Sequence, residues 1–490
     1  MTRDDMTAFR YASGDANPLH ASEQYARHTA FHEPIAHGVL ACLAAIDSSD
    51  DPWDGVGQVD VDFRQPVFPG QEYDVATAAT SEHEQRILVR DGGRRCFDMT
   101  IRRGRAPEDR RAPAATMRDT AADLALDAIM PGRTASGPYG PEWNVGNALA
   151  HQWPVAARRL GPQHLMSLMW CSFLSGMEIP GRRGLTCRVS VRLYPVSEVA
   201  PCTYRAQVRD VDRRFGLVTV AGVLAMGEQT LAEAEIEAMV LDPAPPASLD
   251  DIRQALPASS VLGGRTAAVV GGSRGLGAAV ALALADQGCH VLVGHRHVEP
   301  GLDALTVQAA RISGRITSVR GDATDPEWAE RVVEFVRDRQ ASLDLLVCNA
   351  APAVGRLDFN PAGLPRLDQF VTTAVRLVSA PLSALLPALN AACGRCMAIS
   401  SSALTDPPLD WPHYVTAKAA VEGLVDWAAA HHADVDFFLA RPGMMLTDQT
   451  NTPAMRDIAG RVEPTAAALV RRLVDPTGPR GRPEMVPTPG

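Results

Sequence analysis

Hydrophobic and polar positions follow two similar patterns in the first half of the chain. In the first block, 1–104, an apolar helix is expected near Ile35–Ile46, and strands are expected at 59–67 and 87–90. The second block, 138–242, has an apolar helix near 164–174. Its strands are expected at 185–193, 202–210, 216–225 and 232–241. Each block is predicted to be an α+β unit in which a helix covers one face of a sheet.

The shared order of the two blocks suggests a duplicated unit. Their sheets are expected to pair at the edges, because an unpaired edge strand exposes backbone hydrogen-bonding groups. No close sequence repeat relates the blocks, so the duplication rests on the pattern alone. Two stretches, 104–137 and 242–264, are rich in residues that interrupt periodicity and are predicted to break regular structure as seams between blocks.

The third block, 264–475, differs in kind. Short apolar runs alternate with helical stretches, which is the pattern of a doubly wound, Rossmann-type α/β fold with a parallel sheet. Its strands are expected at 266–270, 291–293, 316–319, 343–347, 396–399 and 437–440. Folds of this type bind nucleotides at the carboxyl ends of their strands.

The composition of the 490 residues excludes several classes of protein. Hydrophobic residues make up 46% and charged residues 21%, the proportions of a soluble globular protein. Acidic residues outnumber basic ones by 57 to 47, so nucleic acid is not an expected partner. The sequence has no signal peptide and no apolar run of about 18 residues, so we expect no membrane partner and a cytoplasmic location.

Cysteine and lysine usage add two points. The nine cysteines are scattered, which fits a reducing compartment. The close pair Cys393 and Cys396 lacks the second pair of ligands that a zinc site needs, so no metal is expected. Lys418 is the only lysine, so 46 of the 47 basic residues are arginine. Because arginine stands at every other basic position, we expect that position 418 requires an amine. The alternative is that one lysine remains in the sequence by chance.

A glycine-rich turn follows the first strand of the third block and opens a helix. It reads Gly271-Gly-Ser-Arg-Gly275-Leu-Gly277. Such a turn lets a pyrophosphate approach bare backbone at the positive end of a helix. The second strand ends at Arg296, where an acidic residue would bind the ribose of NAD. Arg274 and Arg296 both suit a 2′-phosphate, so NADPH is the expected cofactor, unless both are solvated surface arginines.

In these features the third block resembles the short-chain dehydrogenase/reductases over residues 265–450. Five motifs occur in order: the glycine turn, Asp322 after the third strand, Asn349-Ala-Ala, Tyr414-Val-Thr-Ala-Lys418, and Arg441-Pro-Gly443 through Thr447. The family's serine lies thirteen residues before its tyrosine, which selects Ser401 from the run Ser400-Ser401-Ser402.

The resemblance implies a role for each residue of the third block's site. Tyr414 is expected to donate a proton to the carbonyl that receives hydride, and Ser401 to hydrogen-bond the substrate oxygen. Lys418 is expected to lower the pKa of Tyr414 and to hold the nicotinamide ribose. The residues expected to bind the cofactor are Gly271, Ser273, Arg274, Gly275, Gly277, Arg296, Asp322, Asn349, Tyr414, Lys418 and Thr447.

Two features of the third block depart from the family's pattern. A helix asparagine often completes the proton relay, but Ala374 stands near that position, so the relay is expected to run through water or to be lost. After Thr447 the pattern predicts one helix, 465–473, and then a tail rich in proline, glycine and arginine. The family's last strand is therefore expected to be missing or altered.

A second motif lies in the first block. It reads Ser13-Gly-Asp15-Ala-Asn17-Pro-Leu-His20 and is followed by Pro34-Ile-Ala-His37-Gly38. The pair of segments resembles the hydratase-2 motif of MaoC-like hotdog proteins. Pro18 is expected to keep the loop non-helical, so that Asp15 and His20 can both point at one water.

The hydratase-2 resemblance implies that Asp15 and His20 are the acid-base pair that adds water to an enoyl thioester or removes it. Backbone N–H groups near Gly38 are expected to hold the thioester carbonyl, whereas His37 is expected to be structural. The alternatives are a helix-cap or turn residue for Asp15 and a surface residue for His20. The second block resembles a hotdog without a catalytic motif, and is expected to complete a double hotdog and to shape the acyl tunnel.

Both activities meet on one metabolite, so we expect a bifunctional enzyme. Its reductase would convert a 3-oxoacyl thioester to the (R)-3-hydroxyacyl thioester, and its dehydratase would form the trans-2-enoyl thioester, as in polyketide or fatty-acid assembly. The substrate is expected on acyl carrier protein or coenzyme A, and the protein is expected to be a homodimer. The alternatives are the reverse reactions of β-oxidation with NAD, or a binding or scaffold protein with a silent reductase domain.

Overall fold

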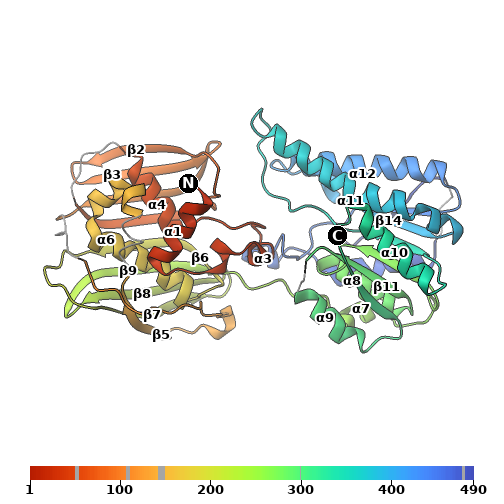
Figure 1. The fold of residues 1–490 in the computed structure, drawn as a ribbon, viewed down its shortest axis with the longest axis horizontal. Helices are drawn as coiled ribbons and strands as arrows, with labels where there is room; N and C mark the ends of the chain where they lie inside the picture. Colours follow the sequence, from red (N-terminus) through yellow and green to blue (C-terminus); the bar gives the residue numbers. More distant parts are fainter. Residues whose placement is uncertain (50–54, 106–110, 142–148, 298–299, 477–480, 490) are drawn as a thin grey trace. The chain divides into compact units, whose positions relative to one another are not determined.

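The computed structural model describes residues 1–49, 55–105, 111–141, 149–297, 300–476 and 481–489. The chain divides into two compact units (Figure 1). The first consists of residues 1–243 with 452–454, and the second of residues 244–451 with 455–490.

The first unit is built on one nine-stranded antiparallel sheet. The strands lie in the order β2-β3-β4-β1-β6-β9-β8-β7-β5. Their bounds are β1 Val56–Phe63, β2 Asp74–Ser81, β3 Glu84–Asp91, β4 Arg94–Arg103, β5 Thr134–Tyr139, β6 Gly184–Leu193, β7 Cys202–Asp212, β8 Leu217–Met226 and β9 Gln229–Val240. The two blocks join where β1 pairs with β6, with Val59 opposite Val191 and Val61 opposite Val189. The predicted pairing of the two sheets at their edges is confirmed.

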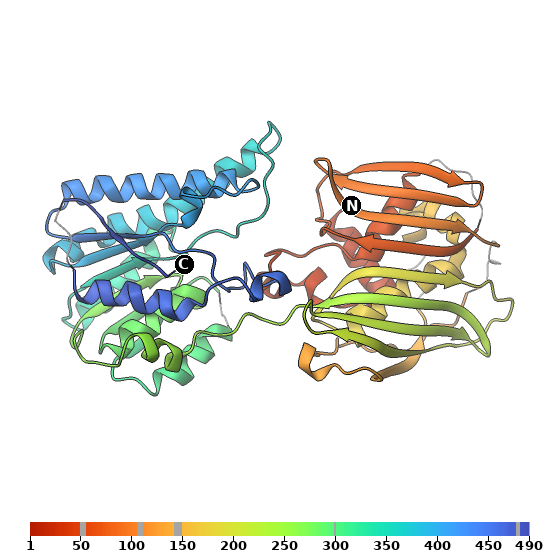
Figure 2. The ribbon, with the colours of Figure 1, turned by 180° about the vertical axis from the view of Figure 1, so that it is seen from behind.

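The longer helices of the first unit cover one face of this sheet, and the opposite face carries none of them (Figure 2). They are α1 Arg3–Ser13, α4 Gly38–Asp47 and α6 Pro154–Phe173. Almost every residue of α6 from Gln163 onward is buried, because the helix packs against the sheet and against both α1 and α4. The π turn η2, Leu174–Glu178, extends α6. Two four-residue helices, α2 Pro18–Ala21 and α3 Glu23–Ala26, follow α1.

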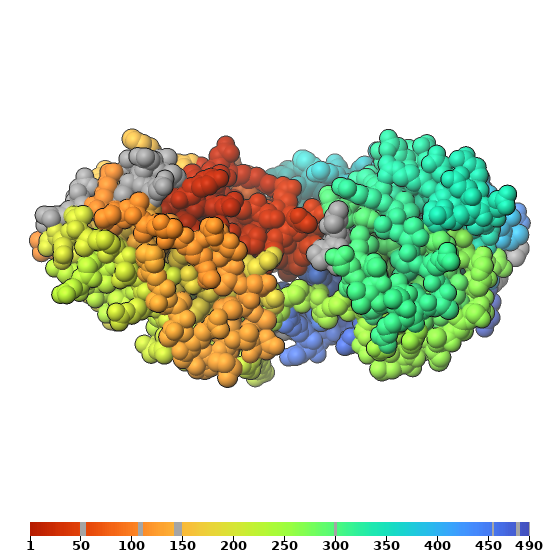
Figure 3. Space-filling model, turned by 60° about the horizontal axis from the view of Figure 1, so that its bottom comes forward, coloured from red at the N-terminus to blue at the C-terminus, as the bar shows by residue number. Residues whose placement is uncertain are grey.

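Several elements of the first unit differ from the expectation. The strand expected over 59–67 ends at Phe63, and the apolar helix begins at Gly38 rather than Ile35. Strands β2 and β4 were not predicted. All eight residues of β2 are exposed, so its sequence shows no alternation. Strand β4 was missed although its buried residues Phe97, Met99 and Ile101 alternate. The seam 104–137 is mostly exposed over residues 111–133, coloured orange in Figure 3, but its end forms β5.

The second unit contains a seven-stranded parallel sheet in the order β12-β11-β10-β13-β14-β15-β16. Its strands are β10 Thr266–Val270, β11 His290–His295, β12 Arg315–Arg320, β13 Leu345–Cys348, β14 Arg395–Ile399, β15 Asp436–Ala440 and β16 Glu484–Val486. Every residue of β10 is buried, as expected for a strand with helices over both faces. The predicted doubly wound parallel sheet is confirmed.

Two hydrophobic cores lie on the two faces of this parallel sheet. The helices around one core are α7 Leu249–Ala255, α8 Gly275–Asp286, α9 Pro300–Ala309 and α14 Val462–Val474. Those around the other are α10 Pro326–Asp338, α11 Leu364–Ala391 and α12 Pro412–His431. A short helix, α13 Pro453–Arg456, precedes α14. Among the described residues α11 alone is long and apolar enough to cross a membrane by length and composition, and here it packs against α10, α12 and β13.

The last strand, which was predicted to be missing or altered, is present but short. Strand β16 lies parallel to β15, with Met485 opposite Leu439. It is only three residues long and occupies the edge of the sheet, where neighbouring prolines are tolerated. A strand of three residues in a tail rich in proline and glycine is too short to show a periodic pattern in the sequence.

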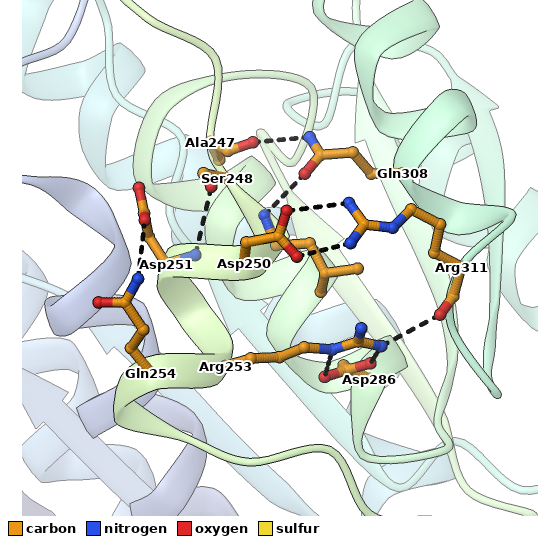
Figure 4. Close-up of polar contacts among 10 residues, drawn as sticks. Ala247, Ser248, Asp250, Asp251, Arg253, Gln254, Asp286, Gln308 and Arg311 are labelled. Atoms are coloured by element: carbon orange, nitrogen blue, oxygen red, sulfur yellow. Dashed lines mark hydrogen bonds and ion pairs between the residues drawn. The ribbon is translucent and has the colours of Figure 1, made fainter.

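The seam 242–264 also contains regular structure that the sequence did not predict, namely helix α7. The Ser248 hydroxyl accepts a hydrogen bond from the Asp251 N–H and caps this helix (Figure 4). Arg253 donates two hydrogen bonds, of 2.9 and 2.6 Å, to the buried carboxylate of Asp286 in α8. Arg311 likewise donates two hydrogen bonds to the carboxylate of Asp250. These contacts hold α7 against the rest of the second unit.

Candidate active sites

The first candidate site begins where α1 ends. Gly14 follows α1 with φ of 72°, the left-handed conformation that turns the chain sharply. Asp15 comes next, and Asn17 caps α2, in which Pro18 is the first residue. His20 therefore lies in a short helix, and the prediction that Pro18 keeps this loop non-helical is wrong. Proline is well tolerated at the first helical position, where its missing N–H costs no hydrogen bond.

Asp15 and His20 come together in the first unit, where Asp15 is buried and His20 is half-buried. Ligand-type atoms of Asp15, His20 and His37 all lie within 4.8 Å of one another. The Nδ1 atom of His20 is 2.8 Å from the carbonyl oxygen of Ile35. A carbonyl oxygen can only accept, so Nδ1 carries the proton and Nε2 is left as an acceptor. The ring is thus oriented as a base through Nε2.

Burial shifts both members of this pair toward their neutral forms. It raises the pKa of Asp15 above its ordinary value, although His20 and the hydrogen bond from Ser172 act in the opposite direction. It lowers the pKa of His20, although the Asp15 carboxylate partly offsets that shift. An acid whose pKa is raised beside a base whose pKa is lowered is suited to proton transfer.

His37 packs against the pair and stabilises its geometry. Its ring stacks on that of His20, with centroids 3.9 Å apart, and its Nε2 is 3.2 Å from the backbone oxygen of Asp15. Burial holds the pKa of His37 well below its ordinary value, so the ring is neutral. Gly38 opens α4 beside it, and a Cβ at that position would lie 2.8 Å from the Phe63 ring. The positive end of α4 therefore adjoins the site.

Asp15, His20 and His37 are also the one group among the described residues that could hold a metal ion. Two of the imidazole nitrogens already face carbonyl oxygens, and the His20 and His37 rings are stacked. The arrangement suits proton transfer, and the prediction that no metal is bound stays a prediction.

The second block contributes residues to this site that the sequence did not reveal. The Ser172 hydroxyl, on α6, donates a 2.6 Å hydrogen bond to Oδ2 of Asp15. The Asn17 side chain donates to the backbone oxygen of Gly181, at 3.2 Å. A Cβ at Gly176 would lie 2.2 Å from Oδ1 of Asp15, so only glycine leaves room for the carboxylate. In the sequence, the one sign of this contribution is that small residues such as Ser172 and Gly176 interrupt the apolar stretch.

The second candidate site lies in the parallel-sheet unit, where β14 ends and α12 begins. Tyr414 and Lys418 are one turn apart on α12, and Lys418 Nζ is 5.6 Å from the Tyr414 ring centroid. The Lys418 ammonium donates a 2.7 Å hydrogen bond to the backbone oxygen of Ile399, the last residue of β14. Ser401 follows two residues later, and its hydroxyl is close enough to the Tyr414 phenol to lower the pKa of that group. The structure thus brings the three predicted catalytic residues together.

Burial also controls the charges at this second site. It lowers the pKa of Lys418 to about 8, although the Glu422 carboxylate acts in the opposite direction. It raises the pKa of Tyr414, and the Ser401 hydroxyl partly offsets that increase. The Lys418 ammonium therefore remains mostly protonated near pH 7, next to a phenol that is still protonated.

A buried network beside Lys418 was not predicted. Glu422 lies one turn after Lys418 on α12 and accepts a hydrogen bond from the Ser400 hydroxyl. Arg441 donates two further hydrogen bonds to the same carboxylate, of 2.8 and 2.6 Å. Because Ser400 is engaged with Glu422, Ser401 is the serine whose hydroxyl faces Tyr414, which agrees with the spacing argument.

The glycine turn has the geometry needed to hold a nucleotide. Gly271 and Gly275 have φ of 73° and 54°, a conformation that disfavours other residues. A Cβ at Gly277 would lie 2.1 Å from the Gly271 oxygen, so the turn closes tightly. The Asn349 amide donates a 2.9 Å hydrogen bond to that same oxygen. The turn leads into α8, and Thr447 lies next to Gly275. Ser273 is buried within the turn.

The two arginines expected at the 2′-phosphate differ in their surroundings. Arg274 precedes α8 and forms a 2.9 Å ion pair with Asp448. Arg296 follows β11 with an exposed side chain, and its Nη1 is 3.5 Å from Oδ2 of Asp322. The Arg274 side chain is 38% exposed and that of Arg296 is 63% exposed. Arg296 is therefore the more accessible of the two.

Ala374, the residue that replaces the relay asparagine, lies buried on α11. Its methyl group cannot hold a water by hydrogen bonding. The expectation that the relay is altered stays a prediction.

Comparisons with known proteins match both halves of the chain. A family model described as short chain dehydrogenase matches residues 265–456, and one described as MaoC like domain matches residues 1–91. The short-chain dehydrogenase/reductase FrzI of Cladobotryum sp is 30% identical over 187 residues, covering 38% of this chain and 72% of that relative. A 3-oxoacyl-[acyl-carrier-protein] reductase of Synechocystis sp. is 27% identical over 195 residues, covering 39% of this chain and 78% of the relative.

Among solved structures, a dehydrogenase/reductase from Sinorhizobium meliloti 1021 is 26% identical. The match covers 46% of this chain and 95% of that one, with a TM-score of 0.41.

We predict that His20 is neutral at pH 7 and carries its proton on Nδ1. Burial lowers its pKa below the ordinary 6.5, so the ring loses its second proton below neutral pH, and the Ile35 oxygen requires a donor at Nδ1. Nitrogen-15 correlation spectra of histidine-labelled protein report the tautomer, and the variant His20→Gln assigns the signal. A ring protonated on Nε2, or on both nitrogens at pH 7, would contradict this geometry.

Proposed function

Because the chain belongs to the short-chain dehydrogenase/reductase family and carries a MaoC-like dehydratase domain in its first 91 residues, we propose a bifunctional enzyme that acts on acyl thioesters. The reductase converts a 3-oxoacyl thioester to the (R)-3-hydroxyacyl thioester. The dehydratase then forms the trans-2-enoyl thioester, in a pathway of polyketide or fatty-acid type. The observation that carries the proposal is the presence in one chain of two buried acid-base sets, one for each step.

The first step takes place at Ser401, Tyr414 and Lys418. The glycine turn and Arg296 would hold NADPH, which would supply the hydride. The Ser401 hydroxyl orients the substrate oxygen next to the Tyr414 phenol, which donates its proton as negative charge develops on that oxygen. Lys418, fixed by the Ile399 oxygen, stabilises the phenolate with its ammonium. In the absence of an asparagine at 374, the proton returns to Tyr414 through water near Lys418.

The second step takes place at Asp15 and His20. Nε2 of neutral His20 removes a proton from C2 of the (R)-3-hydroxyacyl chain. Asp15, whose pKa is raised by burial, gives its proton to the hydroxyl that leaves as water. Backbone N–H groups at the start of α4, near Gly38, stabilise the charge that develops on the thioester oxygen. A proton passed from His20 to Asp15 restores the starting state.

The remaining assignments follow from this proposal. The nine-stranded sheet is that of a double hotdog, with units 1–104 and 138–242. The reductase domain begins at 264, with α7 as an extension in front of it, and includes β16 beyond the predicted bound of 475. The second block shapes the acyl tunnel. The acyl chain is carried by acyl carrier protein or coenzyme A, the location is cytoplasmic, and the protein is a homodimer.

One observation is consistent with the reverse reactions, in which water is added to the enoyl thioester and NAD accepts hydride. Arg274 is paired with Asp448, so one of the two arginines that favour NADPH is already engaged. Product analysis decides between the directions. The protein is incubated with 3-oxoacyl thioesters on both carriers and with NADPH or NADH, and the products are identified by mass spectrometry. Cofactor binding without turnover on any of these substrates would instead indicate a scaffold protein.

We predict that Asp15→Asn and His20→Ala each abolish water loss and leave reduction intact. Each variant removes one partner of the acid-base pair, whereas the reductase has its own core in the second unit. The 3-hydroxyacyl thioester should therefore accumulate, as measured by mass spectrometry. Formation of enoyl product at the parent rate by either variant would show that the dehydratase assignment is wrong.

We predict that Lys418→Arg lowers ketoreduction at least ~100-fold, about 2.7 kcal/mol of transition-state stabilisation. A guanidinium is larger than an ammonium and fixed in a planar fork, so it cannot occupy the same buried position near the Ile399 oxygen and the phenol. Oxidation of NADPH with a 3-oxoacyl thioester measures the rate. Hydration of a short enoyl thioester serves as the control and should be unchanged. Reduction within a few-fold of the parent would mean that charge alone suffices.

We predict that NADPH binds better than NADH by roughly 1–3 kcal/mol, and that Arg296→Asp narrows or inverts this preference. The substitution replaces an accessible cation by an anion at the end of β11. Arg315→Asp is the matched control, because Arg315 begins β12, the parallel neighbour of β11, and so lies at the opposite, amino-terminal end of these strands. Dissociation constants of both cofactors are measured by fluorescence titration. Equal affinity of the parent for both cofactors, or an equal effect of the two substitutions, would contradict the assignment.

A further inference from the structure

The carboxylate of Asp15 is enclosed by the second block, although Asp15 itself belongs to the first. Ser172, which lies 157 residues later in α6, donates a 2.6 Å hydrogen bond to Oδ2 of Asp15. Both residues are buried, with 8% and 1% of their surfaces exposed. A hydrogen bond between two buried groups is shielded from competing water, so it constrains the carboxylate more than a surface contact would.

The Ser172 hydroxyl forms this bond in place of the usual one for a serine within a helix. Such a hydroxyl commonly bonds the carbonyl four residues earlier. Ser167, on the same helix, does this with Gln163 at 2.9 Å, and Ser13 does so with Phe9 at 2.7 Å. Ser172 instead donates across the interface between the two blocks.

The residue one turn after Ser172 provides the space for the carboxylate. Gly176 lies in η2, and a Cβ there would be 2.2 Å from Oδ1 of Asp15. Oδ1 in turn accepts a 3.1 Å hydrogen bond from the backbone N–H of Asn17. The two carboxylate oxygens thus have separate donors, one from each block. With the space left by Gly176, these donors hold the carboxylate in one orientation.

We infer that Ser172 is a positioning residue for the dehydratase, and that the second block supplies part of the catalytic geometry as well as the walls of the acyl tunnel. This inference rests on the proposed function of Asp15 and His20. The hydroxyl fixes the rotamer of Asp15 opposite His20. Because it donates to the carboxylate, it also opposes the rise in the pKa of Asp15 that burial causes.

The test compares Ser172→Ala with Ser167→Ala in the full-length protein. Both variants remove one buried hydroxyl from α6, but only the first removes a donor to Asp15. We expect Ser172→Ala to lower kcat for hydration of a short trans-2-enoyl thioester about 10- to 100-fold, with KM little changed, as for loss of a hydrogen bond to a charged group. Ser167→Ala should stay within a few-fold of the parent.

The pH profile distinguishes a positioning role from a packing role. Without the Ser172 donor the pKa of Asp15 rises further, so the limb of the kcat/KM profile that reports Asp15 should move to higher pH. A packing defect would lower the rate at every pH without moving the limb. Ser172→Cys keeps the volume of the side chain with a weaker donor, should shift the limb in the same direction, and decides the question if the alanine variant does not fold.

The outcomes separate this inference from the proposed function. If Asp15→Asn or His20→Ala retains full hydratase activity, the proposed function fails. If both variants lose hydration but Ser172→Ala and Ser172→Cys keep the parent's rate and pH profile, only the role of Ser172 is overturned. Reduction of a 3-oxoacyl thioester by each variant shows that the second unit remains intact.

Discussion

The antiparallel pairing of β1 with β6 is the interaction on which the first unit depends. Each block alone would leave one of these strands with an unpaired edge and would leave half of a hydrophobic helix layer uncovered. Pairing them puts Val59 beside Val191 and Val61 beside Val189, all four buried, and makes one sheet of nine strands. It also brings α6 of the second block against α1 and α4 of the first. Ser172 reaches Asp15 only because the two blocks share this layer of helices.

In both candidate sites, burial shifts the pKa values of the ionisable groups. In water Asp15 would be ionised at neutral pH and His20 partly protonated, and burial shifts both toward the neutral forms. At the second site the same effect brings the pKa of Lys418 to about 8, and Glu422 keeps it from falling further. Glu422 is itself satisfied by Ser400 and Arg441, so its charge is stable in a buried position. Each reactive group therefore has a nearby partner that limits its shift.

The sequence predicted those parts of the fold whose signals are local. Strands β6 to β9 and the strands of the parallel sheet through β15 alternate or form apolar runs, and the structure has strands there. Strand β2 is fully exposed and β16 is three residues long, so neither has a pattern to detect. Helix α7 was missed because its burial against α8 and α9 depends on residues far along the chain, such as Asp286 and Gln308.

The same limit applies to the candidate sites. Asp15 and His20 lie within one short motif, as do Tyr414 and Lys418, and the structure brings each pair together. Ser172 is 157 residues from Asp15, and Asp448 is 174 residues from Arg274, so spacing could reveal neither contact. The second of these contacts matters for interpretation, because it engages an arginine that the sequence had assigned to the cofactor.

A comparison with another buried cation explains why the one lysine stands at position 418. Burial alone does not exclude arginine, since Arg159 is only 4% exposed. Its guanidinium donates to the backbone oxygens of Ile46 and Ser49 and to the Ser49 hydroxyl, so several acceptors surround its donors. Lys418 instead donates to the single oxygen of Ile399 and lies over the Tyr414 ring, which accepts no such set of hydrogen bonds. A five-donor head group there would leave more buried N–H groups unsatisfied than the ammonium does, at a cost of about 1–3 kcal/mol each. The compact ammonium fits because it needs few acceptors, and its pKa can fall with burial whereas that of a guanidinium stays far above neutral pH.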